Sequence, residues 1–387
     1  MSYINVVKRE FERIKKSPII WASTFILPFL MCFLICIIFA KGSPQDMPVA
    51  VFNQDNSEIS RVFVRNINTL STVKVKYQVT SLKEGEELLK DGKAYGFIYI
   101  PKDFQRDIYR YKQPPLVFYY NNQRILIGGI ISKDINMIAQ TMMVGADAKL
   151  RMKSGVPKDI AISQANLIKV NEHIRSNPYF NYLYFLALIA FGHILQVHFV
   201  LSVVYVIGTE FKYGSAKEWL ECADNSILKA FFGKVAPYFV IFTLVMAIIY
   251  LIYFGFYNVP YTGSIWVGIL TSLLFITSCI SFATLFIAFN GNLRYAISGS
   301  AFFVAMGFAF SGVTYPVMAM PLPSRVFSAT MPIYYYIQTI LDQTFRQIPL
   351  RYDLIFILIQ VFITVICLLS LILIKKYAYD ETRWYQK

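Results

Sequence analysis

Six long apolar segments alternate with one large polar stretch and several short loops. The first segment, Ile19–Ala40, holds about 22 residues without a charged side chain, and at about 1.5 Å per residue it crosses about 30 Å of hydrocarbon. After it comes a polar stretch of about 140 residues, and the remaining apolar segments begin near Tyr182. The pattern predicts transmembrane helices at residues 19–40, 182–209, 235–257, 265–290, 295–318 and 354–374.

The first apolar segment has two interpretations, an uncleaved anchor or a cleavable signal peptide. Five basic residues precede it, as in both. Its apolar run is longer than the roughly 7–15 residues of a signal core, and Ile38 stands where a small residue is expected before cleavage after Ala40. These features favour an anchor, so we expect all six segments in the mature protein.

The polar stretch has the pattern of a small domain. Short β-type runs alternate with helix-like segments that begin at capping residues; the runs cover residues 49–53, 73–79, 96–100 and 116–120. This predicts an α/β domain at residues 41–181, outside the cytoplasm and inserted between the first two spans. The five cysteines lie elsewhere, so the domain is expected to hold together without disulfides.

The residues before the first span form an amphipathic pattern. Val7, Phe11 and Ile14 recur at helical spacing, with charged residues on the other faces. We expect residues 1–18 to form a helix along the inner surface of the membrane, in contact with lipid.

Composition and charge agree with a membrane protein. Apolar residues make up 56% of the chain and charged residues 16%, with a net charge of +14. The basic residues are scattered, with no basic stripe interleaved with aromatic residues, which excludes nucleic acid as the expected partner. Lys and Arg in the short loops follow the positive-inside rule if both termini are cytoplasmic, and residues 375–387 then form a cytoplasmic tail.

Catalytic and metal-binding patterns are missing from the sequence. Gly233-Lys234 lacks the other residues of a phosphate-binding loop, and no His, Cys or carboxylate cluster has metal-ligand spacing. The predicted spans also contain no Asp, Glu, Lys or Arg, which argues against an ion-driven carrier. Two interpretations remain open for His193 and Gln196: hydrogen bonds between helices, or the lining of a substrate path.

The segment after the second span resembles a known family. Residues 208–220 read Gly-Thr-Glu-Phe-Lys-Tyr-Gly-Ser-Ala-Lys-Glu-Trp-Leu, similar to the cytoplasmic signature of the ATP-binding-cassette type-2 exporter permeases. Gly233, Lys234 and Pro237 also match, whereas Lys212 and Asp224 stand where the family commonly has an acidic residue and a proline. The resemblance implies that residues 210–234 dock on an ATPase subunit. The implied coupling residues are Glu210, Gly214, Ser215, Glu218, Trp219 and Leu220.

A second block strengthens the resemblance. Residues 310–316, Phe-Ser-Gly-Val-Thr-Tyr-Pro, and the later Met-Pro pairs look like the family's break at the outer end of the fifth span. This implies a re-entrant outer segment over residues 316–353, with Pro316, Pro321 and Pro332 at its turns. Small residues in the fifth span allow close helix packing. Two interpretations are open for Phe302, Met306 and Phe310, the lining of a path or packing against lipid or the core.

The resemblance implies an α-helical membrane protein with six transmembrane helices and an inserted extracytoplasmic α/β domain. It would be the permease of an exporter of drugs or amphiphiles in a bacterial inner membrane, paired with a second identical or related permease. ATP and Mg²⁺ would be bound by the ATPase subunit, with no cofactor in this chain. A periplasmic membrane-fusion adaptor and an outer-membrane channel are further implied partners. The alternatives are a lipid or polysaccharide exporter and a membrane-anchored receptor or assembly scaffold.

Overall fold

The computed structural model describes residues 2–110, 112–123, 125–165, 177 and 181–380. Parts of the predicted polar domain and of the C-terminal tail therefore lie outside the described residues. The chain divides into two compact units. The first comprises residues 1–40, 175–177 and 181–387, and the second comprises residues 41–174 and 178–180.

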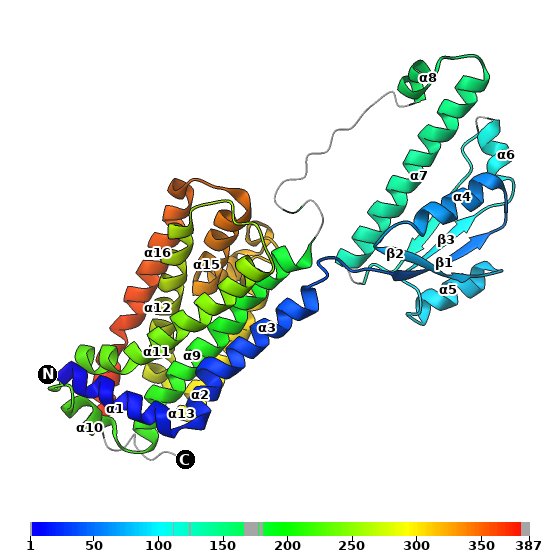
Figure 1. The fold of residues 1–387 in the computed structure, drawn as a ribbon. Coiled ribbons are helices and arrows are strands. Elements are labelled where there is room, and N and C mark those ends of the chain that lie inside the picture. Colours follow the sequence, from blue (N-terminus) through cyan, green and yellow to red (C-terminus); the bar gives the residue numbers. More distant parts are fainter. Residues whose placement is uncertain (1, 111, 124, 166–176, 178–180, 381–387) are drawn as a thin grey trace. The chain divides into compact units, whose positions relative to one another are not determined.

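The first unit is a helical bundle (Figure 1). Within the described residues, six helices are long and apolar enough to span a membrane: Pro18–Phe39, Leu183–Lys212, Ile227–Phe256, Ile265–Phe289, Leu293–Phe310 and Leu350–Ala378. They confirm the predicted number of spans. Several contain π-helical turns or a break, so each is built from one to three labelled elements: α2 (Pro18–Trp21), η1 (Ala22–Ile26), α3 (Leu27–Phe39), η2 (Leu183–Ala187), α9 (Leu188–Lys212), α11 (Ile227–Tyr250), η3 (Leu251–Phe256), α12 (Ile265–Asn290), α13 (Leu293–Phe310), α16 (Leu350–Leu369) and α17 (Leu371–Ala378).

The second and fourth spans form the centre of the bundle. Inside this single chain, 72% of the most apolar 18-residue stretch of the second span and 67% of that of the fourth are buried, compared with 22–33% for the other four spans. Phe199 of α9 stacks on Phe242 of α11 at 4.1 Å, and Phe275 of α12 stacks on Tyr336 at 4.0 Å. The remaining spans therefore expose broad apolar faces, which suits contact with lipid or with another protein.

Buried charged side chains lie in three of the spanning helices, each one residue beyond a predicted span. The helices extend beyond the predicted spans and include Glu210, Lys234 and Asp353, each 0% exposed. Asp353 accepts a hydrogen bond from Nε2 of Gln343 at 2.6 Å. The predicted spans end at residue 209 or begin at residues 235 and 354, next to these charges, and a charged group can be buried where partners compensate it.

The fifth span ends at Phe310, eight residues before its predicted end. Gly312 has a φ of +83°, a conformation that glycine adopts without strain, and Ser328 Oγ donates to the carbonyl of Phe310 at 2.7 Å. Short helices follow: η4 (Val317–Ala319), α14 (Leu322–Ala329), α15 (Pro332–Leu341) and η5 (Asp342–Arg346). Pro316 and Pro321 immediately precede η4 and α14, and Pro332 begins α15, as expected where a fixed φ suits a helix start.

The second unit is a four-stranded sheet covered by helices. Its elements are β1 (Met47–Asn53), α4 (Glu58–Ile67), β2 (Val73–Gln78), α5 (Leu82–Lys90), β3 (Gly96–Ile100), α6 (Phe104–Tyr109), β4 (Val117–Tyr120), α7 (Ile125–Lys153) and α8 (Lys158–Ala165). The strand order is β2-β1-β3-β4, with β4 antiparallel to β3 and the other pairs parallel. Helices α4 and α7 cover one face and α5 the other (Figure 1). The predicted strands are therefore present.

Candidate coupling site

Helix α1 (Ser2–Lys16) packs directly on the bundle, along α11. Val6, Glu10 and Ile14 are 0%, 1% and 2% exposed, and their spacing of four residues places them on one face of the helix. The packing is close at Gly233 of α11, where a Cβ atom would lie 2.9 Å from Cβ of Val6. A larger residue at this position would force the two helices apart.

Only part of the predicted apolar face of this helix is buried. Ile14 contacts the bundle, Val7 is half-buried and Phe11 is 48% exposed. The buried face of the helix is therefore rotated from the apolar face that the sequence pattern predicts, and it carries a carboxylate, Glu10. The exposed apolar side chains remain available to lipid, so the membrane contact of residues 1–18 stays a prediction.

Glu210, near the end of α9, is the centre of a buried ionic cluster. Arg9 donates from both terminal nitrogens to its two carboxylate oxygens, at 3.0 and 2.9 Å. Arg13 Nη1 donates to Oε1 at 2.8 Å, and Lys234 Nζ donates to the same oxygen at 2.6 Å. Such paired, charge-assisted bonds are among the stronger polar interactions in proteins.

Lys234 connects the two carboxylates of the cluster. Its Nζ atom also donates to Oε2 of Glu10 at 2.7 Å, and Tyr238 donates to Oε1 of Glu10 at 2.8 Å. Lys234 is 0% exposed. Three cations and two carboxylates therefore join α1, α9 and α11, and the loss of one partner would leave a buried charge uncompensated.

Arg9 lies at the edge of the cluster, with 29% of its side chain exposed. Burial acts to lower its pKa, but the hydrogen bond and charge of Glu210 outweigh burial and raise the pKa above its ordinary value. Arg9 therefore stays protonated, which preserves the charge balance of the cluster at physiological pH.

The predicted coupling segment is attached to this cluster. Gly214 has a φ of +69° and turns the chain from α9 into the short helix α10 (Ala216–Glu221). Ser215 Oγ donates to the carboxylate of Glu210, and Ser215 N donates to the Glu210 carbonyl at 2.8 Å. The start of α10 is thus held by the residue that organises the cluster.

The predicted coupling residues separate into an inner and an outer set. Trp219 and Leu220 are 0% exposed; Trp219 Nε1 donates to the carbonyl of Ala230 at 3.1 Å, and its ring lies 5.4 Å from Nζ of Lys234. Glu218 is exposed. Trp219 and Leu220 therefore anchor α10 to the bundle, whereas Glu218 faces outward.

Sequence reasoning missed much of this cluster. It placed Arg9 on the polar face of an interfacial helix, did not use Glu10 and assigned no role to Lys234 beyond loop charge and motif. A signal was present, because Glu10 lies four residues from both Val6 and Ile14, and Lys234 begins an apolar run. A charge in an apolar stripe indicates a buried pair only when its partner is known, and Glu10 and Lys234 are 224 residues apart in the sequence.

The candidate path residues also separate into two sets. His193 and Gln196 are 9% and 0% exposed, between α9 and α13, with the His193 ring 4.9 Å from that of Phe308. Phe302 is 69% exposed. Met306 and Phe310 are half-buried, and Phe310 contacts Phe327 at 4.8 Å between ring centroids.

His193 and Gln196 both carry buried polar atoms. Within the described part of the chain, neither His193 Nε2 nor either amide atom of Gln196 has a hydrogen-bond partner. A buried polar group without a partner is costly, so these groups suit contact with water or with another polar group. Nε2 of His198 lies 3.4 Å from the sulfur of Met31 in the first span.

The six spans and the buried ionic cluster describe a polytopic membrane protein of the permease class. The family model for ABC-2 family transporter proteins matches residues 18–374, so the chain belongs to the ABC-2 family of transporter proteins. Members of this family are the membrane components of transporters, and membership implies an ABC ATPase partner and a dimeric arrangement. The family resemblance found in the sequence is therefore confirmed.

Among curated proteins, the chain is similar to the "Probable multidrug ABC transporter permease YbhR" of Escherichia coli strain K12. The two are 20% identical over 318 residues, which cover 82% of each chain. The protein of the same name from Escherichia coli O157:H7 gives the same identity and coverage. No solved structure gave a significant match.

Proposed function

We propose that this chain is the permease subunit of an ATP-driven exporter that moves hydrophobic or amphiphilic compounds out of the cytoplasm or the inner leaflet. The name of the curated relatives, probable multidrug ABC transporter permease, supports this choice of cargo. In this proposal ATP and Mg²⁺ bind to a separate ATPase subunit, and this chain carries no ATPase site of its own.

The ionic cluster around Glu210 is the observation that carries the proposal. It joins α1, α9 and α11 through contacts of 2.6–3.0 Å, and Ser215 at the start of α10 bonds to Glu210. A displacement of α10 by the ATPase would therefore move the ends of α1, α9 and α11 together. Glu218 and its exposed neighbours Tyr213 and Lys217 provide the docking surface, while Trp219 and Leu220 transmit the displacement.

The translocation path is proposed to follow the surface shared by α9 and α13, completed by a second permease half. The buried polar atoms of His193 and Gln196 would bind water or a polar group of the cargo there. Phe302, Met306 and Phe310 would contact its apolar part, because π-systems and thioethers adapt to varied apolar shapes.

We further propose that both termini are cytoplasmic and that the chain lies in a bacterial inner membrane. The second unit would then stand on the periplasmic side. A periplasmic membrane-fusion adaptor and an outer-membrane channel are the proposed partners there, and residues 316–353 form the outer re-entrant segment. The basic residues of the short loops support this orientation.

The decisive experiment measures ATP hydrolysis by the copurified complex in proteoliposomes, across a panel of amphiphilic compounds. Glu218→Lys should abolish stimulation and reduce recovery of the ATPase subunit, because it reverses a charge at the docking surface. The matched control is Glu87→Lys on α5, another exposed glutamate, in the second unit. It should retain both the stimulation and the recovery of the ATPase subunit.

The outcomes also separate the alternatives. Stimulation by lipids or polysaccharide precursors, and not by drugs, would establish the rival exporter. A complex that contains no ATPase, purified from membranes in which ATPase subunits are detectable, would overturn the exporter and favour a receptor or scaffold.

A further inference from the structure

A pocket of about 500 Å³ lies between the third and fourth spans. It is in the half of these helices remote from the ionic cluster, since Lys234 is near the start of α11 and the pocket begins at Thr243. Its walls are apolar side chains from α11, η3 and α12, among them Met246, Leu251, Phe254, Ile265, Ile269 and Ile276. The volume is within the range of about 300–1,000 Å³ seen for small-molecule sites.

The hydroxyl groups of the wall are already hydrogen-bonded within the protein. Thr243 donates to the carbonyl of Phe239 at 2.8 Å, and Ser272 donates to that of Gly268 at 2.7 Å. Tyr261 donates to the carbonyl of Ser264 at 3.0 Å, and Tyr250 bonds to the hydroxyl of Tyr336. A water molecule needs several polar partners in a cavity, so this wall favours hydrocarbon.

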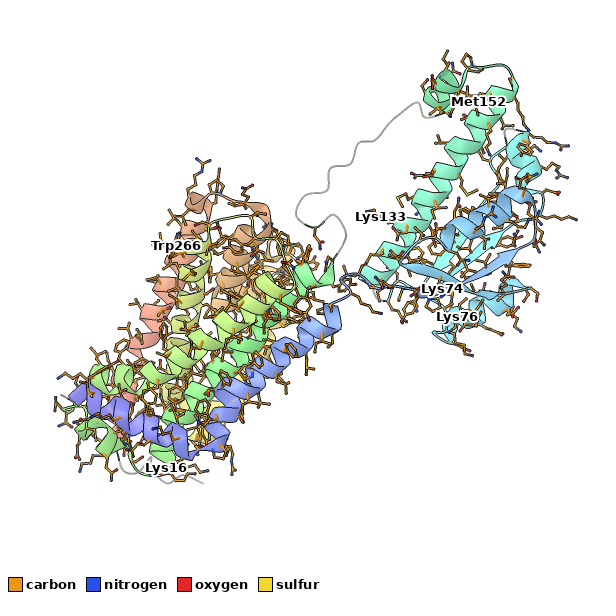
Figure 2. The ribbon with its side chains drawn as sticks, in the orientation of Figure 1. Lys16, Lys74, Lys76, Lys133, Met152 and Trp266 are labelled. Carbon is orange, nitrogen blue, oxygen red and sulfur yellow. The ribbon has the colours of Figure 1, made fainter. Side chains whose placement is uncertain are left out.

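The pocket opens on the outside of the bundle. Leu251 and Ile265 of its wall are 71% and 64% exposed. Trp266, next to Ile265, is 80% exposed and lies on the outer surface of the bundle (Figure 2). These residues belong to membrane-spanning helices, so the opening faces the hydrocarbon of the bilayer.

The length of the pocket matches one leaflet. From Thr243 to Gly255 the wall rises about 18 Å along the helix, compared with about 15 Å for half of a hydrocarbon core of about 30 Å. A single acyl chain that entered from the side would run along this whole length, because it crosses one leaflet and no more.

We propose that this pocket binds one acyl chain of a bilayer phospholipid. An empty pocket would leave its wall without dispersion contacts, and the surrounding lipid supplies chains of the required length and polarity. The surrounding lipid is as apolar as the wall of the pocket, so binding of an acyl chain depends on how closely the chain packs against that wall. The bound chain joins α11–η3 to α12 and exchanges more slowly than lipid on the open surface.

Two substitutions fill the pocket without disturbing its wall. A Cβ atom at Gly255 would meet no atom within 4 Å, so Gly255→Leu projects into open space. Ala247 is an exposed part of the wall, and Ala247→Phe adds bulk from α11. The matched control is Val240→Phe, which adds an aromatic ring at a site on α11 that is 54% exposed and outside the pocket.

The test uses the full-length chain in its copurified complex, reconstituted in nanodiscs of phosphatidylethanolamine and phosphatidylglycerol. A trace phospholipid carries a photoreactive diazirine in its acyl chain, and mass spectrometry locates the adducts. We expect adducts concentrated on residues 243–255 and 265–276. They should be lost in both filling variants and kept in Val240→Phe, with thermal stability unchanged in all three.

Three results would overturn the proposal. Adducts spread evenly over all exposed spans, or unaffected by the filling variants, would show ordinary surrounding lipid. A disulfide-linked dimer formed by Leu251→Cys in a Cys222→Ser background would show that a second copy covers the pocket; Cys222 is the exposed cysteine. Displacement of the adducts by a stimulatory drug, and not by excess phospholipid, would assign the pocket to cargo.

Discussion

At the scale of single residues, Lys234 is the cation that joins the two carboxylates of the cluster. It is 0% exposed and lies within 2.7 Å of both Glu10 and Glu210. Removing one member of a buried ion pair leaves the other charge without compensation, at a cost of about 3–5 kcal/mol. The same charges in isolation would be expelled from a membrane span, so their burial depends on the whole cluster.

Lys234→Met should therefore destabilise the bundle by about 3–5 kcal/mol. The measurement is chemical unfolding in mild detergent, followed by the fluorescence of the buried Trp219. The matched control is Lys229→Met, five residues away, where the lysine is 53% exposed and pairs with an exposed aspartate; it should change stability by less than about 0.5 kcal/mol. Equal stability of Lys234→Met and the parent would refute a structural role for the cluster.

A double variant tests whether the cluster acts as a unit. In Lys234→Met with Glu10→Gln, part of the uncompensated charge is removed together with the lysine. Its destabilisation should fall short of the sum of the two single variants, because contacting residues are coupled by about 0.5–3 kcal/mol. Simple additivity would mean that Lys234 and Glu10 do not interact.

At the scale of elements, the contact of α1 with α11 decides where the first helix lies. A Cβ atom on Gly233 would come within 2.9 Å of Val6 Cβ and 3.2 Å of the carbonyl oxygen of Tyr3. Backbone cannot yield as a flexible side chain can, so any larger residue must displace α1. The displacement would also lengthen the contacts of Arg9, Glu10 and Arg13 with the cluster.

Gly233→Val should therefore release α1 and expose its basic residues. We expect limited trypsin digestion to cleave residues 8–16 several times faster than in the parent, as local opening becomes easier. Gly255→Val is the control, because it lies in the same span with no neighbour within 4 Å. Unchanged cleavage in Gly233→Val would show that α1 does not depend on this close approach.

At the scale of the whole molecule, the two units have separate cores. The second unit buries Val49, Val51 and Ile98 on the face of its sheet under α4 and α7, and Ala50 and Phe97 on the face under α5. Gly85 allows α5 to lie close to the ring of Phe97, which a Cβ atom would approach to within 2.4 Å. A unit that buries both faces of its sheet has what independent folding requires.

Residues 41–180 expressed alone should therefore fold as a soluble domain. Circular dichroism should show mixed helix and strand, with a single cooperative thermal transition. Ile98→Asp should abolish that transition, because a carboxylate at a fully buried position has no partner there. An unfolded parent fragment would show that the unit needs the bundle for its stability.

The sequence predicted the elements well and the site in part. Six apolar runs and four β-type runs are local patterns, and each reappears as a span or a strand. The coupling segment is predicted from its motif, whereas the inward direction of Trp219 and Leu220 comes only from the structure. Glu10, Arg9, Arg13 and Lys234 were missed as a group, because a partner far along the chain leaves no periodic signal.

By itself, the sequence determined the class of protein and the number of its spans. Hydrophobic length is a property of consecutive residues, and the bilayer imposes it directly. Only the tertiary structure decided which charges could be buried, because burial of Glu210 and Lys234 depends on helices α1, α9 and α11 meeting at one place. It also decided which apolar side chains face inward and where a pocket remains, since both depend on how neighbouring helices pack.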